Sequence, residues 1–269
     1  MNGAAFRFAI RHSIRSAAFL ALGLGLFYWV TLLSSSSFLG DGDQPLPEFL
    51  TEPPRTLQAL IGGSGDFLSP TGWLASGMLH PIVLALTSMG ALMVVAGTGS
   101  AELERGTLDL VLSRPITRRA YLISRASAGL MLLTLVVVGG LTGTLISRVV
   151  VDRVDQLPIG KTVMGFGAMW LLYAGFAMIG LWIFARSHLR SRALGAVIAV
   201  VVLSFFVNFV SLLFDVLSWL GYLSPFHYFN IANIIEGRGF VGHMVVLAGI
   251  SVGAGALALW EFERRDLTR

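Results

Sequence analysis

Long apolar runs alternate with short polar segments along the whole chain. A run of roughly 17–25 apolar residues is long enough to cross a bilayer as an α-helix. None of the runs shows the sustained period-two alternation that a membrane β-strand requires. The pattern therefore predicts an all-α, polytopic membrane protein with a single domain over residues 1–269. Its six predicted transmembrane helices cover residues 17–33, 73–96, 120–146, 163–185, 193–214 and 241–260.

The N-terminal segment carries Arg7, Arg11 and Arg15 at a spacing of four residues. This spacing predicts an interfacial helix over residues 1–16, lying on the inner membrane surface. Ordinary positive flanking of the first span explains the arginines equally well. The apolar run over residues 17–33 exceeds the roughly 7–15 residues of a signal-peptide core, so we expect it to remain as the first span.

Positive charge is distributed unevenly between the two sides of the predicted bundle. The side of the N-terminus has Arg7, Arg11, Arg15, Arg105, Arg114, Arg118, Arg119, Arg125, Arg186, Arg190, Arg192, Arg264, Arg265 and Arg269, whereas the other side has Arg55, Arg148, Arg153, Lys161 and Arg238. Cytoplasmic loops of membrane proteins carry an excess of lysine and arginine. Both termini are therefore predicted to be cytosolic, in a multi-pass protein of the inner or plasma membrane.

The overall composition agrees with this picture. Hydrophobic residues make up 55% of the chain and charged residues 13%, and the mean hydropathy is +0.77. There is no cysteine, which excludes disulfides, thiolate catalysis and Cys-ligated metals. No polar stretch is long enough to fold into a basic nucleic-acid-binding domain, so we expect no nucleic acid partner.

Two longer segments are predicted on the outer side. Residues 34–72 form an acidic loop in which the prolines 53 and 54, followed by Gly62, predict one short helix. Residues 215–240 form a second outer or re-entrant segment before the last span.

The most polar part of the chain is a short cytosolic stretch, "AELERGTLDLVLSRP", at residues 101–115. Acidic residues open it and Arg114 closes it, which suits the dipole of a helix that ends at Pro115. Leucines occur on more than one side of this predicted helix. Such a helix is stable when it docks in a groove of a partner protein.

This stretch resembles the signature of ABC-2 type transporter permeases, the membrane subunits of one class of ABC transporter. The signature has an acidic pair (Glu102, Glu104), then Gly-Thr-Leu (106–108), a leucine-rich turn, Pro115 and a basic patch. Two further stretches, "LSPFHYFN" (223–230) and "FERRDL" (262–267), are also similar to the family.

The resemblance implies that residues 101–115 are a coupling helix that binds a separate, cytosolic ATP-hydrolysing subunit. The implied ATPase-coupling residues are Glu102, Leu103, Glu104, Gly106, Thr107, Leu108, Leu110, Arg114 and Pro115. The glutamates would pair with basic residues of the ATPase and the leucines would fill its groove. At the membrane surface, Arg118 and Arg119 are expected to contact anionic lipid.

The resemblance also implies the other partners and the direction of transport. Such a permease pairs with a second copy, as a homodimer or heterodimer, and exports a substrate; an extracytoplasmic partner is a further candidate. The chain itself is then not an enzyme and holds no cofactor, because ATP and Mg²⁺ bind the partner subunit.

The sequence indicates the transport path less clearly than it indicates the coupling helix. His80, Asn208 and Asp215 are polar residues in or beside the spans and are candidate pathway residues. Aromatic positions that would suit a lipid-like or drug-like substrate are Phe166, Trp170, Phe176, Trp182, Phe205 and Phe206, although lipid-facing packing explains them as well.

Two GxxxG pairs, Gly139–Gly143 and Gly249–Gly253, allow helix backbones to approach closely. We expect both to pack within the chain rather than at a dimer seam.

Other motifs do not support a different activity. The stretch "DQLPIGKT" has Asp155 where a phosphate-binding loop needs glycine, and "GGSG" places Ser64 in a loop without a histidine base. The five histidines lack ligand spacing, so no metal site is expected. The alternatives to a permease are an autonomous channel or secondary carrier, which the lack of carboxylates at depth opposes, and an intramembrane enzyme.

Overall fold

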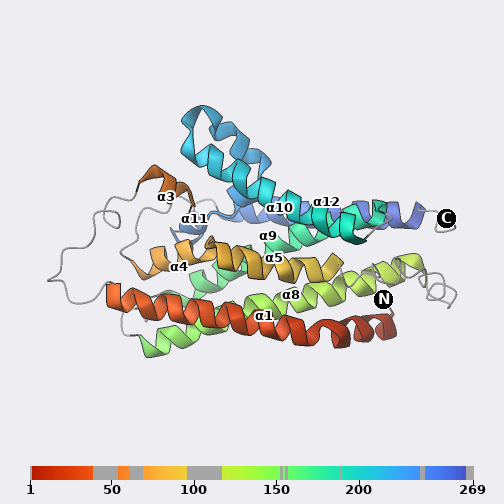
Figure 1. Ribbon diagram of the computed structural model, residues 1–269, viewed down its shortest axis with the longest axis horizontal. Helices are drawn as coiled ribbons and strands as arrows, with labels where there is room; N and C mark the ends of the chain where they lie inside the picture. The colour runs from red at the N-terminus through yellow and green to blue at the C-terminus, as the bar shows by residue number, and fades with distance from the viewer. Residues whose placement is uncertain are drawn as a thin grey trace.

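The computed structural model describes residues 2–38, 54–60, 69–95, 117–151, 154, 157–187, 190–236 and 240–264. Helices account for nearly all of these residues, and no strand occurs among them. They form an elongated bundle of roughly parallel long helices (Figure 1). The all-α fold predicted from the hydrophobic pattern is confirmed.

The helices are α1 (Gly3–Phe38), α3 (Arg55–Leu60), α4 (Pro70–Met78), α5 (Pro81–Val95), α8 (Arg118–Val150), α9 (Ile159–Arg186), α10 (Arg190–Leu213), the 3₁₀ helices η3 (Asp215–Leu223) and η4 (Pro225–Tyr228), α11 (Ile231–Glu236) and α12 (Phe240–Arg264). Five of them are long and apolar enough to cross a membrane. The pair α4 and α5 makes a sixth span if the two are counted together, although they are bent by 54°. The model therefore agrees with six spans, one of them broken.

The break in the second span follows from its sequence. Proline lacks a backbone N–H and disfavours the helical conformation of the residue before it. At the break, the N–H of His80 bonds to the carbonyl of Gly77 (3.2 Å), and Pro81 begins α5. At its other end, α4 begins after Ser69, whose hydroxyl accepts a hydrogen bond from the N–H of Gly72 (3.1 Å).

The first span continues without interruption from the N-terminal segment. A helix of 36 residues is about 54 Å long, which exceeds a hydrocarbon core of about 30 Å. The guanidinium of Arg125 in α8 lies 5.1 Å from the ring centre of Phe8, and the N–H of Asn2 donates to Ser124 (2.6 Å). Residues 3–16 of the interfacial helix predicted over residues 1–16 are continuous with the first span in α1 and pack against the start of α8; their position on the inner membrane surface stays a prediction.

Glycines set the distance between α1 and α8. A Cβ atom on Gly139 would overlap the backbone of Ala21, and one on Gly143 would overlap the backbone of Gly25. This pair therefore packs within the chain, as the sequence predicts.

The second GxxxG pair differs. No described residue comes within 4 Å of a Cβ atom placed on Gly249 or Gly253, so the prediction of intrachain packing is wrong here. Instead, α12 meets α9 through Gly255, beside Met178, and through Ser251, whose hydroxyl donates to the carbonyl of Leu171 (3.3 Å).

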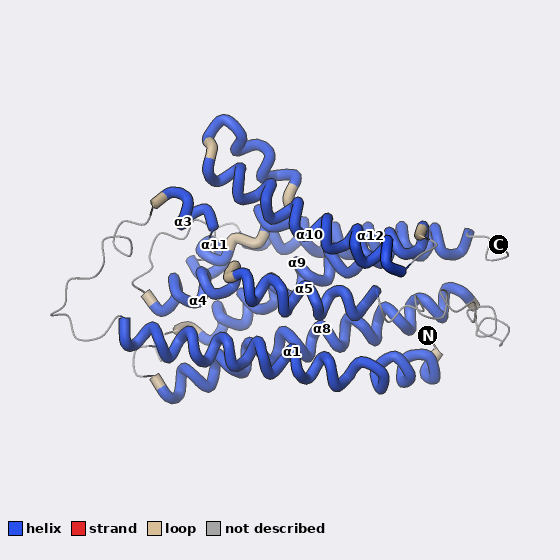
Figure 2. The backbone as a smooth tube through the Cα atoms, viewed as in Figure 1, coloured by secondary structure: helices blue, strands red, loops and turns tan. Residues whose placement is uncertain are grey.

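The centre of the bundle is α9, which contacts α5, α8, α10 and α12. Its large side chains, among them Tyr173, Phe176 and Phe184, are buried. Both chain ends lie at the same end of the bundle, as do the end of α5 and the start of α8 (Figure 2). At the opposite end, η3 folds back along the end of α10, and the short helix α3 lies nearby (Figure 1).

An apolar groove between α5 and α10

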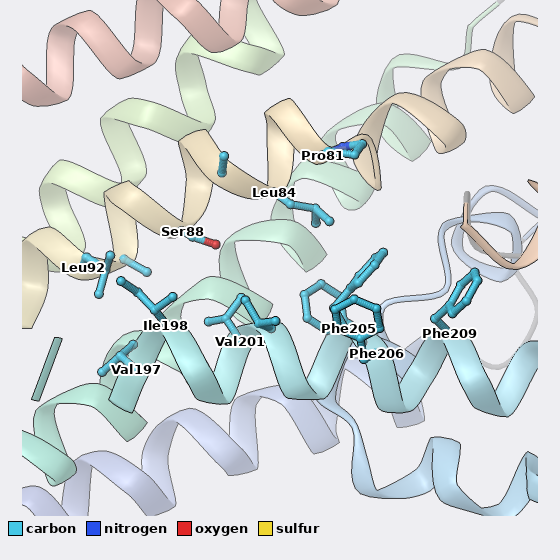
Figure 3. Close-up of a pocket in the computed structure, with 14 residues that line it drawn as sticks. Pro81, Leu84, Ser88, Leu92, Val197, Ile198, Val201, Phe205, Phe206 and Phe209 are labelled. Carbon is cyan, nitrogen blue, oxygen red and sulfur yellow. The ribbon is translucent and has the colours of Figure 1, made fainter. Parts of the chain in front are cut away.

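A groove with a volume of about 490 Å³ lies between α5 and α10. Figure 3 shows side chains from the two helices facing each other across it. From α5 come Pro81, Leu84, Ala85, Ser88, Ala91 and Leu92; from α10 come Val197, Ile198, Val201, Val202, Phe205, Phe206 and Phe209; and η4 adds Phe226.

The lining positions recur every three to four residues in both helices. This spacing places them on one face of each helix. On α10 the face is incompletely covered by the rest of the chain: Val197 and Val201 are buried, whereas Phe206 is 55% exposed. The groove is therefore open along part of α10.

One end of the groove is built from aromatic rings. The ring centre of Phe226 lies 5.4 Å from that of Phe176 and 5.7 Å from that of Phe205. Phe205 in turn meets Phe206 edge-on at 6.1 Å. Edge-to-face and tilted ring pairs at these distances are stabilising, so the rings form a connected cluster from the core of α9 to the open side of the groove.

Ser224 fixes the position of Phe226. Its buried hydroxyl donates to the carbonyl of Ser204 in α10 (2.7 Å) and accepts from the N–H of Phe226 (3.1 Å). This links the turn before η4 to α10, so the aromatic wall of the groove includes a residue from outside the long helices.

Among the described residues that line the groove there is no ionisable side chain, and their one side-chain polar group is the hydroxyl of Ser88. Such a site has no general acid, general base or metal ligand. Within the described ranges, no group of three or more His, Cys, Asp or Glu residues could hold a metal ion. The groove is suited to binding an apolar molecule.

The three predicted pathway residues do not line this groove. Asp215 is exposed at the end of the bundle opposite the start of α1, where it pairs with Arg55 of α3 (3.3 Å). The ring of His80 packs against Phe27 at 4.9 Å, and its Nδ1 accepts the N–H of Ile82 (3.2 Å). Asn208 is buried in α10. A pathway role for these residues stays a prediction.

The six predicted aromatic positions fall into three groups. Phe205 and Phe206 line the groove, Phe166 and Phe176 are buried in the core, and Trp170 and Trp182 are partly buried against it. One sequence signal marks the groove positions. Phe205, Phe206 and Phe209 continue the three-to-four-residue spacing of the aliphatic residues that precede them in α10.

The predicted coupling residues, from Glu102 to Pro115, lie outside the described residues. Immediately after them, Thr117 caps α8 by accepting the N–H of Ala120 (3.2 Å). The guanidinium of Arg119 lies 3.8 Å from the carboxylate of Glu263 in α12. Arg119 thus has a protein partner in addition to the lipid contact expected for it.

A second ion pair joins the same end of α12 to α9. Arg186 lies 3.7 Å from Glu261. The last turns of α12 are therefore connected to α8 and to α9 at the end of the bundle where α5 ends and α8 begins.

Sequence reasoning treated the histidines as isolated, whereas the structure brings two of them together. The ring centres of His227 in η4 and His243 in α12 are 6.1 Å apart. Tyr222 packs on His227 at 4.6 Å. The two histidines lie in elements separated by α11, so no sequence spacing indicates their proximity.

Comparison with known families decides the class of protein. A family model described as "ABC-2 family transporter protein" matches residues 9–267. The chain belongs to the ABC-2 family of transporter membrane proteins. This agrees with the resemblance carried by residues 102–119 and with the multi-pass helical bundle. No curated protein matches the chain.

Proposed function

We propose that this protein is the permease subunit of an exporting ABC transporter. It binds a separate ATP-hydrolysing subunit through residues 101–115, pairs with a second permease copy, and moves its substrate along the α5–α10 face. ATP and Mg²⁺ act on the partner subunit, and this chain supplies the path through the inner or plasma membrane.

The observation that carries this proposal is the grouping of charged elements at one end of the bundle. The helix ends that flank residues 96–116 lie beside both chain termini (Figure 1). Arginines of the described helices also belong to this end, among them Arg7, Arg11 and Arg186. An excess of arginine is typical of the cytoplasmic side, so a soluble ATPase would reach residues 101–115 there.

The open side of the groove is consistent with a second permease copy. A path through the membrane must be closed to lipid while a substrate passes. A partner copy that covers the exposed part of α10 would provide the missing wall, whether it is identical to this chain or a different permease. Exposed apolar residues on α10, such as Phe206 and Leu203, can contact either lipid or a partner copy.

Co-purification with the ATPase encoded beside this chain tests the proposal. We expect the ATPase to bind the wild-type permease in detergent and to be lost from a Glu102→Arg/Leu108→Asp double variant. Exposed ion pairs contribute only about 0.2–1 kcal/mol, so most of the loss should come from the leucine.

A control for the first of these substitutions is Glu48→Arg, which makes the same change of charge as Glu102→Arg but in the predicted outer loop. This variant should retain the ATPase. Equal binding by the double variant and the wild type would overturn the coupling assignment, and a chain that transports without any ATPase would be a channel or secondary carrier.

A further inference from the structure

We propose that the α5–α10 groove binds an uncharged, largely apolar molecule that contains a flat or aromatic ring system. The inference rests on the proposed function in one respect, namely that the molecule bound is the one transported. Binding itself can be measured on this chain without an ATPase.

The charge of the ligand follows from the lining. None of the described residues on the walls of the groove is Asp, Glu, Lys, Arg or His. Moving an ionised group into such surroundings without a partner costs far more than moving an apolar one. An inorganic ion, a nucleotide or a charged peptide would meet nothing that offsets this cost.

The polarity of the ligand follows from its hydrogen-bonding partners. Ser88 supplies one hydroxyl, and the other lining side chains are aliphatic or aromatic. A buried polar group left without a partner costs about 1–3 kcal/mol. A sugar with several hydroxyls would leave most of them unpaired, whereas an apolar molecule with one polar group would not.

The size of the ligand follows from the volume. A cavity of about 490 Å³ falls within the range of roughly 300–1,000 Å³ typical of sites for drug-sized molecules. A protein segment or a polysaccharide would extend far beyond it.

The shape of the ligand follows from the arrangement of the rings. Phe205, Phe206 and Phe226 form the connected cluster at one end, and Phe209 lies next to them along α10 (Figure 3). On the facing helix, the small residues Ala85, Ser88 and Ala91 alternate with Leu84 and Leu92. A flat ring system can lie over the small residues and meet the phenylalanine edges, which favours it over a flexible acyl chain.

The absence of cysteine makes a clean test possible, because a single introduced thiol is the only one in the chain. Val202 and Leu203 are adjacent on α10 and therefore lie at nearly the same depth. Val202 lines the groove and is 45% exposed, whereas Leu203 does not line it and is 63% exposed. Val202→Cys reports on the groove, and Leu203→Cys is its matched control.

The full chain carrying each variant would be placed in phosphatidylcholine nanodiscs. The rate of alkylation by N-ethylmaleimide would be measured by mass spectrometry in the presence of one of two added compounds. The first is 9-anthracenemethanol, which is neutral; the second is 9-anthracenecarboxylate, which has the same rings and a negative charge. We expect the neutral compound to slow alkylation of Val202→Cys by about tenfold at ten times its dissociation constant. Alkylation of Leu203→Cys should be unchanged, and the carboxylate should protect neither.

Four results would overturn the proposal. Equal protection of both thiols would indicate simple partition into lipid, and equal protection by the carboxylate would remove the charge argument. Protection by hexadecanol but not by the ring compound would indicate an acyl-chain site. A Val202→Cys thiol that is inert in dimeric particles, whatever is added, would indicate that the second copy fills the groove. Loss of ATPase binding in the separate coupling experiment would leave all of these outcomes unaffected.

Discussion

Gly143 of α8 lies directly against Gly25 of α1, and a Cβ atom on Gly143 would overlap the carbonyl oxygen of Gly25. One helix turn earlier, Gly139 faces Ala21 in the same way. The two helices therefore cross with their backbones in contact, which only small residues permit. This contact holds the first span against the third in the second half of α8.

Replacing Gly143 by alanine should destabilise the protein, because the backbones of α1 and α8 must separate to admit one methyl group. Overpacking of this kind typically costs about 1–3 kcal/mol. Gly253→Ala is the matched control, since no described residue lies within 4 Å of the added carbon. The midpoint of thermal unfolding in detergent should fall for Gly143→Ala only; an equal fall in both would mean that glycine flexibility, and not close packing, matters.

The ion pair between Arg119 and Glu263 should contribute little to stability. The side chains are 67% and 46% exposed, and their atoms are 3.8 Å apart. Exposed pairs are worth about 0.2–1 kcal/mol. We expect Arg119→Glu to lower stability by no more than this, and the added change Glu263→Arg to restore it. A double-mutant cycle measures the coupling, and a coupling energy well above 1 kcal/mol would show that the pair is shielded from water.

Acidification should weaken the contact between η4 and α12. Burial, and secondly the nearby imidazole of His243, lower the pKa of His227 from its ordinary value of 6.5. Tyr222 and Tyr228 also pack around the two histidines. The folded protein thus takes up a proton at His227 less readily than the unfolded chain. The resulting stability is fully present above about pH 6.5 and is lost as the pH falls through the lowered pKa.

Unfolding midpoints measured between pH 7.5 and 5 would test whether acidification lowers the stability of the protein. The wild type should lose stability on acidification, and His227→Gln should lose less. His12→Gln, in α1 at the other end of the bundle, is the control and should follow the wild type. A His227→Gln profile as steep as that of the wild type would contradict the assignment.

Ser224→Ala should loosen the aromatic wall of the groove. It removes the hydroxyl that bonds to the carbonyl of Ser204 and to the N–H of Phe226. We expect the free energy of unfolding to fall by about 1–3 kcal/mol, because a buried N–H loses its partner. Protection of Val202→Cys by the neutral ring compound should also become weaker. Ser34→Ala removes a hydroxyl that donates to the carbonyl of Val30 at an exposed site and should change neither quantity. Unchanged protection in Ser224→Ala would show that Phe226 does not shape the site.

The membrane spans were predictable from the sequence because a bilayer requires long apolar runs, and helix breaks follow local rules. Pro81 divides the second span where proline chemistry requires a break. The extension of α1 to Gly3 was missed, since the arginines of residues 3–16 suggest a surface helix. The packing of Phe8 on Arg125 of α8 joins this segment to the bundle instead.

The groove could not be predicted from the sequence, because it depends on contacts between helices that residue spacing does not reveal. The apolar faces of α5 and α10 are visible in the sequence, but their pairing into one groove is set by how both helices pack on α9. His227 and His243 meet only because η4 turns back toward α12. Gly249 and Gly253 have the same spacing as Gly139 and Gly143, yet among the described residues only Gly139 and Gly143 face another helix of the chain. The family signature at residues 102–119 came from the sequence alone.

The decisive measurement is the rate of ATP hydrolysis by the partner ATPase with and without this chain in nanodiscs. We expect the wild-type chain to change the vanadate-sensitive rate, whereas the Glu102→Arg/Leu108→Asp variant, folded to the same unfolding midpoint, should leave it unchanged. A rate that is identical with no chain, with wild type and with the variant would contradict the claim that this protein couples to a separate ATPase through residues 101–115.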